Sequence, residues 1–203
     1  MIQAASRSNV RKYNNPNPVH QLLLRRFLRC VAQEAQGALR THNCPRLLDV
    51  GCGEGYVLRH LRGAWPELAA QGVDGDREAL VQARGSIPGA FLGHADASYL
   101  PFAGNSFDMV ACLEVLEHLR EPALAMEELA RVSRGYLLLS VPNQPFFSLS
   151  NLVRGKNVRR LGEDPEHLHH WTALQFVSMI KGRFKVSRVR YPFPWVLVLA
   201  ETR

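Results

Sequence analysis

A glycine-rich turn between a short apolar strand and a helix constrains the fold of this chain more than any other feature. Residues 46–50 predict a buried strand and residues 57–61 predict a helix. Glycine recurs at alternate positions between them: Gly51, Gly53 and Gly55. Glycine permits positive φ where the chain reverses, and it leaves space for backbone to lie against a bound molecule. The turn therefore predicts a ligand site at the carboxyl end of the strand.

The spacing of these glycines argues against two common phosphate-binding loops. A dinucleotide-binding fingerprint runs G-x-G-x-x-G, whereas this turn runs G-x-G-x-G. A Walker loop ends in Gly-Lys-Ser or Gly-Lys-Thr, but Tyr56 follows Gly55 here. The acidic Asp49 just inside the turn is unfavourable beside a pyrophosphate and favourable beside an ammonium group. We therefore expect a ligand that is cationic at this end.

Two further acidic residues end the predicted second and third strands. Asp74 lies 21 residues after Gly53, the separation at which the second strand of a βαβ unit ends beside the first. A carboxylate there accepts hydrogen bonds from both ribose hydroxyls. Asp96 follows the apolar residues 91–92, where a carboxylate accepts from the exocyclic amine of an adenine, and Ala97 leaves room for the ring. The ligand is therefore expected to contain a ribose, with space for an adenine.

Together these residues resemble the class I S-adenosylmethionine-dependent methyltransferases, specifically the broad group that includes the ubiquinone and menaquinone methyltransferases. The resemblance spans roughly residues 46–145, about half of the chain. Several ordered segments carry it: residues 48–55, 72–74, 95–97, 100–102, 106–110 and 114–118. It implies that the cofactor is S-adenosylmethionine and that S-adenosylhomocysteine is the product.

The resemblance also implies a place for each cofactor-binding residue. The methionine end is expected at Asp49, Gly51, Cys52 and Gly53, with Tyr13 lying over it from the segment before the first helix. The ribose is expected at Asp74 and the adjacent Gly75, and the adenine at Asp96 and Ala97. Leu113, after the fourth strand, is expected near the sulfonium.

Alternating strands and helices predict an α/β fold with a doubly wound, Rossmann-like sheet, mostly parallel with an antiparallel final strand. An N-terminal helix over residues 18–37 and a lid inserted after the fifth strand complete it. Strands are predicted at 68–74, 90–93, 107–113, 136–141, 184–189 and 196–200. We expect a single methyltransferase domain over residues 1–203: a helical cap (1–45), a cofactor-binding core (46–142), a substrate lid (143–171) and a C-terminal helix and strands (172–203).

Candidate catalytic residues follow the fourth strand. Glu114, Glu117 and His118 have the spacing i, i+3, i+4, which predicts a shared helix face. The carboxylates can polarise His118 into a general base, or all three can bind a divalent cation. A later histidine can complete either arrangement: His167, His169 or His170. We favour the metal-free interpretation, with Glu117, His118 and His170 as catalytic residues and no metal ligand.

The net charge of +7 is unevenly distributed. Residues 63–142 carry five basic and eleven acidic side chains, whereas residues 1–62 and 143–203 each carry ten basic side chains and few acidic ones. The basic flanks either improve solubility or recognise an anionic partner, such as a phosphorylated or carboxylated small molecule, RNA or a membrane surface. The leading hypothesis is methyl transfer to a small molecule, aromatic or anionic, at oxygen, carbon or nitrogen. Metal-assisted RNA 2′-O-methylation and a non-catalytic methyltransferase-like subunit are the alternatives.

The remaining features predict a cytoplasmic protein. No run approaches about 18 apolar residues, and the first residues lack the apolar stretch of a signal peptide. The four cysteines form no C-x-x-C pair, which predicts reduced thiols without a zinc site or a disulfide. Oligomeric state is left open by the sequence.

Overall fold

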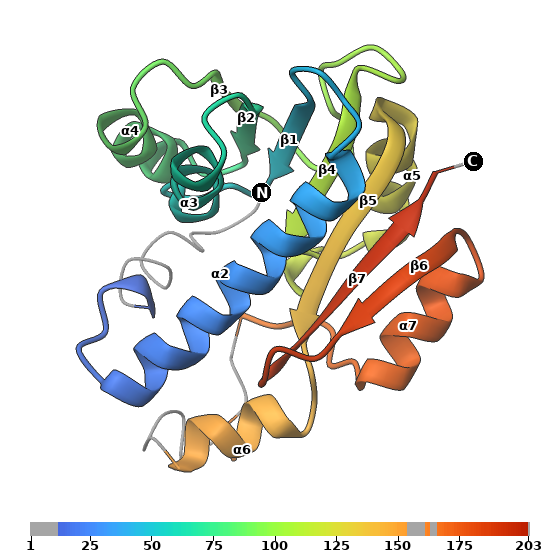
Figure 1. The fold of residues 1–203 in the computed structure, drawn as a ribbon. Helices are drawn as coiled ribbons and strands as arrows, with labels where there is room; N and C mark the ends of the chain where they lie inside the picture. The colour runs from blue at the N-terminus through green and yellow to red at the C-terminus, as the bar shows by residue number, and fades with distance from the viewer. Residues whose placement is uncertain (1–11, 154–160, 163–165, 203) are drawn as a thin grey trace.

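Seven strands form one sheet in the order β3-β2-β1-β4-β5-β7-β6 in a computed structural model that describes residues 12–153, 161–162 and 166–202 (Figure 1). The first five strands run parallel, and β7 is antiparallel to both β5 and β6. The strands are β1 Arg46–Val50, β2 Ala69–Asp74, β3 Leu92–His94, β4 Phe107–Leu113, β5 Ser133–Pro142, β6 Lys185–Arg190 and β7 Trp195–Glu201. The predicted Rossmann-like fold, with its antiparallel final strand, is confirmed.

Helices cover both faces of the sheet. They are α2 Pro18–Leu39, α3 Tyr56–Ala64, α4 Arg77–Ser86, α5 Pro122–Val132, α6 Phe146–Val153 and α7 Ala173–Lys181, with a 3-10 turn, η1, at Leu116–His118. Side chains alternate along each strand. Leu47 and Met109 therefore face α2, α3 and α4, whereas Leu48 and Val110 face α5 and α7. Asp49 shares its face with Leu47, which directs it toward α2 and α3.

The long helix α2 begins because Asn17 caps it. The Asn17 side chain accepts hydrogen bonds from the amides of Val19 and His20, and Pro18 occupies the first helical position, where its missing amide hydrogen costs nothing. Apolar residues spaced three to four apart, such as Phe27 and Val31, are buried against the sheet. The cap therefore fixes where the chain before α2 meets the sheet edge.

The carboxyl ends of β1, β4 and β5 point toward the side of the molecule occupied by α6 and the N-terminal end of α2 (Figure 1). In open α/β sheets, ligands bind outside these ends. The predicted lid begins there as α6, whereas its residues 154–160 and 163–165 lie outside the described part of the chain.

Two strands, β5 and β3, start two or three residues away from their predicted first residue. β5 begins at Ser133, three residues before the predicted start, because α5 ends at Val132 and leads into the strand without a loop. β3 is limited to Leu92–His94. Within the described ranges, no helix has the combined length and apolar character needed to cross a bilayer.

Candidate functional site

The glycine turn packs directly against the loop that follows β4. Gly51, Gly53 and Gly55 all have positive φ, and the amides of Gly51 and Cys52 both donate to the Val73 carbonyl, at 2.8 and 3.1 Å. A Cβ at Gly51 would lie 2.2 Å from the Cγ2 atom of Val115. Glycine is therefore required at position 51 by both backbone conformation and space.

Asp74 ties the end of β2 to this turn. One carboxylate oxygen accepts from the Gly53 amide and the other from the Asp76 amide, each at 2.7 Å. Burial raises the pKa of Asp74 above its ordinary value, although these two hydrogen bonds oppose the rise. Asp74 thus has a structural role that its spacing from Gly53 did not reveal, and its contact with a ribose stays a prediction.

Most of the residues predicted for the methionine end line one small cavity of about 40 Å³, but Gly53 is not among its lining residues. Asp49, Gly51 and Cys52 reach it from β1 and the turn, Leu113 from the end of β4, and Tyr13 from the segment before α2. Parallel strands end at one sheet edge, so Asp49 and Leu113 meet there although they are 113 − 49 = 64 positions apart. The predicted grouping of these residues therefore appears in the structure.

The cavity is strongly acidic. Asp49 is buried, and its Oδ2 has no hydrogen-bond partner among the described residues. Burial and, to a lesser extent, the nearby Asp74 carboxylate together raise the pKa of Asp49 to about 7. Glu54 also lines the cavity, is 5% exposed, and has no described hydrogen-bond partner for either carboxylate oxygen. An acidic residue between two turn glycines was the only sequence signal for Glu54.

The raised pKa of Asp49 predicts that cofactor binding is linked to proton release. Below about pH 7 the carboxyl group is protonated, but an ammonium group requires the carboxylate. At pH 6 we therefore expect binding of S-adenosylhomocysteine to release up to about one proton, and affinity to fall up to about tenfold per pH unit below pH 7. Calorimetry in two buffers of different ionisation enthalpy measures this release.

Asp49→Asn is the matched variant for this experiment, because it removes the titrating group while keeping its size. It should bind the cofactor weakly and with less proton release. Burial also raises the pKa of Glu54 and Asp74, so these groups contribute with the same sign. Affinity that is constant between pH 5.5 and 8 contradicts a role for Asp49 as the ammonium partner.

The segment that carries Tyr13 is fastened to the start of α2. The Gln21 side chain donates to the carbonyls of Tyr13 and Asn15, at 2.9 and 2.8 Å. The Tyr13 ring stacks on the Tyr56 ring, with centroids 4.0 Å apart and an interplanar angle of 1°. Tyr13 is thereby held at the acidic cavity, and its place over the methionine end of a cofactor stays a prediction.

The residues predicted for the adenine lie at neighbouring strand ends, outside this cavity. β3 pairs with β2, and His94 at its end contacts the Gly75 carbonyl through Nε2 at 3.1 Å. Asp96 is exposed and accepts from the Ser98 amide at 2.8 Å, while Ala97 is buried. Roles for Gly75, Asp96 and Ala97 in cofactor binding remain predictions.

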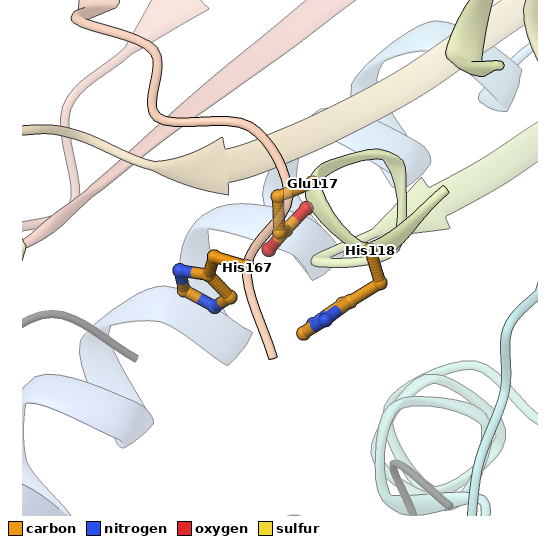
Figure 2. A group of neighbouring side chains, drawn as sticks. All are labelled: Glu117, His118 and His167. Atoms are coloured by element: carbon orange, nitrogen blue, oxygen red, sulfur yellow. The ribbon is translucent and has the colours of Figure 1, made fainter. Parts of the chain in front are cut away.

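The predicted helix face shared by Glu114, Glu117 and His118 is wrong. Glu114 has φ +57, so the chain takes a left-handed residue before the single turn of η1. Glu114 consequently lines the acidic cavity, whereas Glu117 and His118 lie in a second group with His167 (Figure 2). One ligand atom from each of these three residues lies within 4.8 Å of the others.

Backbone contacts hold this second group together. The amides of Leu168 and His169 donate to the Glu117 carbonyl, at 2.8 and 3.1 Å. The His118 Nδ1 contacts the carbonyl of Glu166 at 3.0 Å. His170 is exposed, and its ring centroid lies 6.2 Å from that of His167. The tertiary structure therefore brings His167, and not His170, into the group with Glu117 and His118.

Comparisons with known proteins find methyltransferases. Residues 48–139 match the family described as "Methyltransferase domain". A probable S-adenosylmethionine-dependent methyltransferase of Mycobacterium tuberculosis is 33% identical over 132 residues, covering 64% of this chain and 43% of that protein. The demethylmenaquinone methyltransferase of Roseiflexus castenholzii is 32% identical over 136 residues, covering 61% and 57%. The chain therefore matches only about half the length of these curated relatives.

A solved structure shows the same fold. Magnesium protoporphyrin IX methyltransferase from Synechocystis PCC 6803, with bound S-adenosylhomocysteine, matches with a TM-score of 0.65 and 18% identity, covering 97% of this chain and 100% of that chain. Residues 48–139 therefore match a methyltransferase domain, and this part of the chain is similar to S-adenosylmethionine-dependent methyltransferases.

Proposed function

We propose that this protein transfers the methyl group of S-adenosylmethionine to a small-molecule acceptor, at oxygen, carbon or nitrogen, by in-line displacement. The observation that carries the proposal is the convergence of Tyr13, Asp49, Gly51 and Leu113 on one acidic cavity at the ends of parallel strands. Such a cavity favours a ligand that carries an ammonium and a sulfonium. S-adenosylmethionine has both, and its product retains only the ammonium.

The leaving group in this reaction is a neutral thioether, so the protein contributes mainly alignment and exclusion of water. A base is needed only when the acceptor must lose a proton. We assign that role to His118. Its Nδ1 contacts the Glu166 carbonyl, which favours the tautomer with the lone pair on Nε2, and the nearby Glu117 carboxylate stabilises the imidazolium that forms. His170 is proposed to border the acceptor.

Aromatic side chains on the acceptor side support an apolar or aromatic acceptor. Phe146 and Phe193 are 49% and 42% exposed, and their ring centroids lie 6.3 Å apart. Phe147 approaches His167, with ring centroids 5.5 Å apart. The name of the demethylmenaquinone methyltransferase among the relatives points to an acceptor of the same kind. An aromatic ring that carries a hydroxyl group fits this surface.

Calorimetry on the purified protein tests the proposal. We expect one molecule of S-adenosylmethionine or S-adenosylhomocysteine to bind per chain. Transfer of a labelled methyl group to a panel of hydroxylated aromatic compounds then tests the acceptor class, with His118→Ala as the variant that should lose turnover and keep cofactor affinity. Absence of binding by both cofactor forms contradicts the proposed activity.

A metal-assisted transfer is the second candidate, and the group of Glu117, His118 and His167 favours it. Two imidazoles and one carboxylate are a ligand set that binds divalent transition metals and leaves open positions. The His118 Nδ1 contact with a carbonyl resembles the partner that usually orients a metal-bound histidine. Such a metal would polarise and acidify an acceptor hydroxyl.

Chelation separates the two candidates. If a metal assists, EDTA should lower turnover without changing S-adenosylhomocysteine affinity, Mn²⁺ should restore it, and Glu117→Gln should lose Mn²⁺ binding measured by calorimetry. Turnover that is indifferent to EDTA supports the metal-free reaction. The RNA version of this candidate additionally requires RNA binding that weakens steeply with salt.

A further inference from the structure

Lys12 extends into the acidic cavity from the segment before α2. Its ammonium pairs with a carboxylate oxygen of Glu114 at 2.5 Å, and the two side chains are only 17% and 16% exposed. The ammonium also lies 5.1 Å from the centroid of the Trp195 ring, within range of a cation–π contact. A cationic group of this chain is therefore held in the cavity that we propose for a cationic cofactor.

The cavity is too small for the methionine part of the cofactor while Lys12 and Tyr13 stand in its wall. Its volume is about 40 Å³, whereas ligand pockets in proteins typically measure about 300–1,000 Å³. A bound amino acid moiety needs several times the volume of this cavity. Cofactor binding therefore requires part of this wall to move.

Lys12 is the part of the wall that can move at the smallest structural cost. The His20 ring contacts the Lys12 carbonyl at 2.7 Å, and Gln21 holds the Tyr13 carbonyl, so the backbone is fixed at the start of α2. The Lys12 side chain is long and flexible beyond that anchor. It can leave Glu114 by rotation about its own bonds, without unfolding any described element.

The charges in the cavity favour the replacement of the Lys12 ammonium by a positively charged cofactor. Lys12 is the one cationic side chain among the described residues that line it, opposite Asp49, Glu54 and Glu114. The second oxygen of Glu114, Oε1, is buried without a described hydrogen-bond partner. When the lysine leaves, Glu114 is a buried carboxylate that needs another cation.

We propose that Lys12 is a tethered counterion that competes with the cofactor for Glu114, and that its release lets Glu114 distinguish the sulfonium of S-adenosylmethionine from the neutral thioether of S-adenosylhomocysteine. This inference rests on the proposed function. It makes Glu114 a specificity-determining residue that favours the substrate form of the cofactor over the product form.

The test is the affinity of variant proteins for both cofactor forms, measured by calorimetry. Lys12→Met keeps the length of the side chain and removes the competitor. We expect it to bind S-adenosylmethionine about 5- to 10-fold more tightly and S-adenosylhomocysteine less than about 2-fold more tightly. Glu114→Gln should bring the two affinities closer together, and adding Lys12→Met to it should have no further effect on their ratio.

Two controls accompany these variants. Lys12→Arg keeps the charge and should leave the ratio of affinities unchanged. Arg25→Met removes an exposed cation from α2 that does not line the acidic cavity, so it should also leave the ratio unchanged. Thermal melting shows whether each variant is folded.

The outcomes separate this inference from the function on which it rests. Wild-type protein that binds neither cofactor form overturns the proposed function itself. Wild-type protein that binds both, together with a folded Lys12→Met protein whose ratio of affinities is unchanged or whose affinities are both weakened, overturns the counterion role alone. In the weakened case Lys12 would be a ligand of the bound cofactor.

Discussion

Gly51→Ala is expected to destabilise the fold by about 2–4 kcal/mol and to abolish measurable cofactor binding. The alanine Cβ would lie 2.2 Å from the Cγ2 atom of Val115, and the backbone at this position has φ +79. Val115 is β-branched and stiff, so the glycine turn must shift to relieve the contact. Because this turn forms the floor of the cavity, the shift also displaces Asp49 and Cys52. Urea unfolding and S-adenosylhomocysteine calorimetry measure the two effects.

Two further variants separate the causes. Adding Val115→Ala to Gly51→Ala removes the close contact but leaves the positive φ, so it should recover part of the stability. Gly63→Ala is the matched control, because Gly63 lies within α3 with nothing within 4 Å of an added Cβ. It should stabilise the helix by about 0.5–1 kcal/mol and leave affinity unchanged. If Gly51→Ala keeps wild-type stability and affinity, the close contact between residue 51 and Val115 does not constrain the turn.

Asp74→Ala is expected to weaken cofactor affinity by at least about 100-fold. The substitution removes the acceptors of two 2.7 Å hydrogen bonds, from the amides of Gly53 and Asp76, and with them the proposed ribose ligand. The turn at Gly53 then loses its link to the end of β2. Asp74→Asn keeps the shape and one acceptor oxygen, so it should lose about tenfold. Calorimetry with S-adenosylhomocysteine gives both values.

The neighbouring Asp76 provides the control for Asp74. Its side chain accepts from the amides of Glu78 and Ala79 and so caps α4. Asp76→Ala should therefore cost about 1 kcal/mol of stability and leave cofactor affinity nearly unchanged. Equal losses of affinity in Asp74→Ala and Asp76→Ala would show that the loss arises from local destabilisation and not from a ligand contact.

Local patterns were sufficient for most of the fold. The boundaries of β4 were predicted correctly from its apolar run. A parallel strand that is buried on both faces is apolar throughout, and Asp108 is the one charged residue in it. The cap at Asn17 and apolar residues that recur every three to four positions give α2 bounds close to the predicted ones. The start of β5 was missed because α5 enters the strand without the turn residues that mark a boundary.

Some residues of the candidate site could also be placed from the sequence, and others could not. Asp49, Gly51 and Asp74 could be placed from the sequence, because each follows a strand whose end the topology brings to one edge of the sheet. Glu114 could not be placed correctly. Its spacing to Glu117 and His118 suits a helix, but the left-handed residue at Glu114 turns its side chain to a different site. A spacing rule holds only while the backbone keeps one conformation.

The sequence by itself determined the order of strands and helices, the glycine turn and the three aspartates that end successive strands, because these depend on periodicity and conformational preference over a few residues. Only the tertiary structure decided that Lys12 meets Glu114, 102 positions away, and that His167 joins Glu117 and His118. Such contacts depend on where the segments before α2 and after α6 pack. Sequence patterns over a few residues do not specify this packing, because it depends on the tertiary structure of the whole domain.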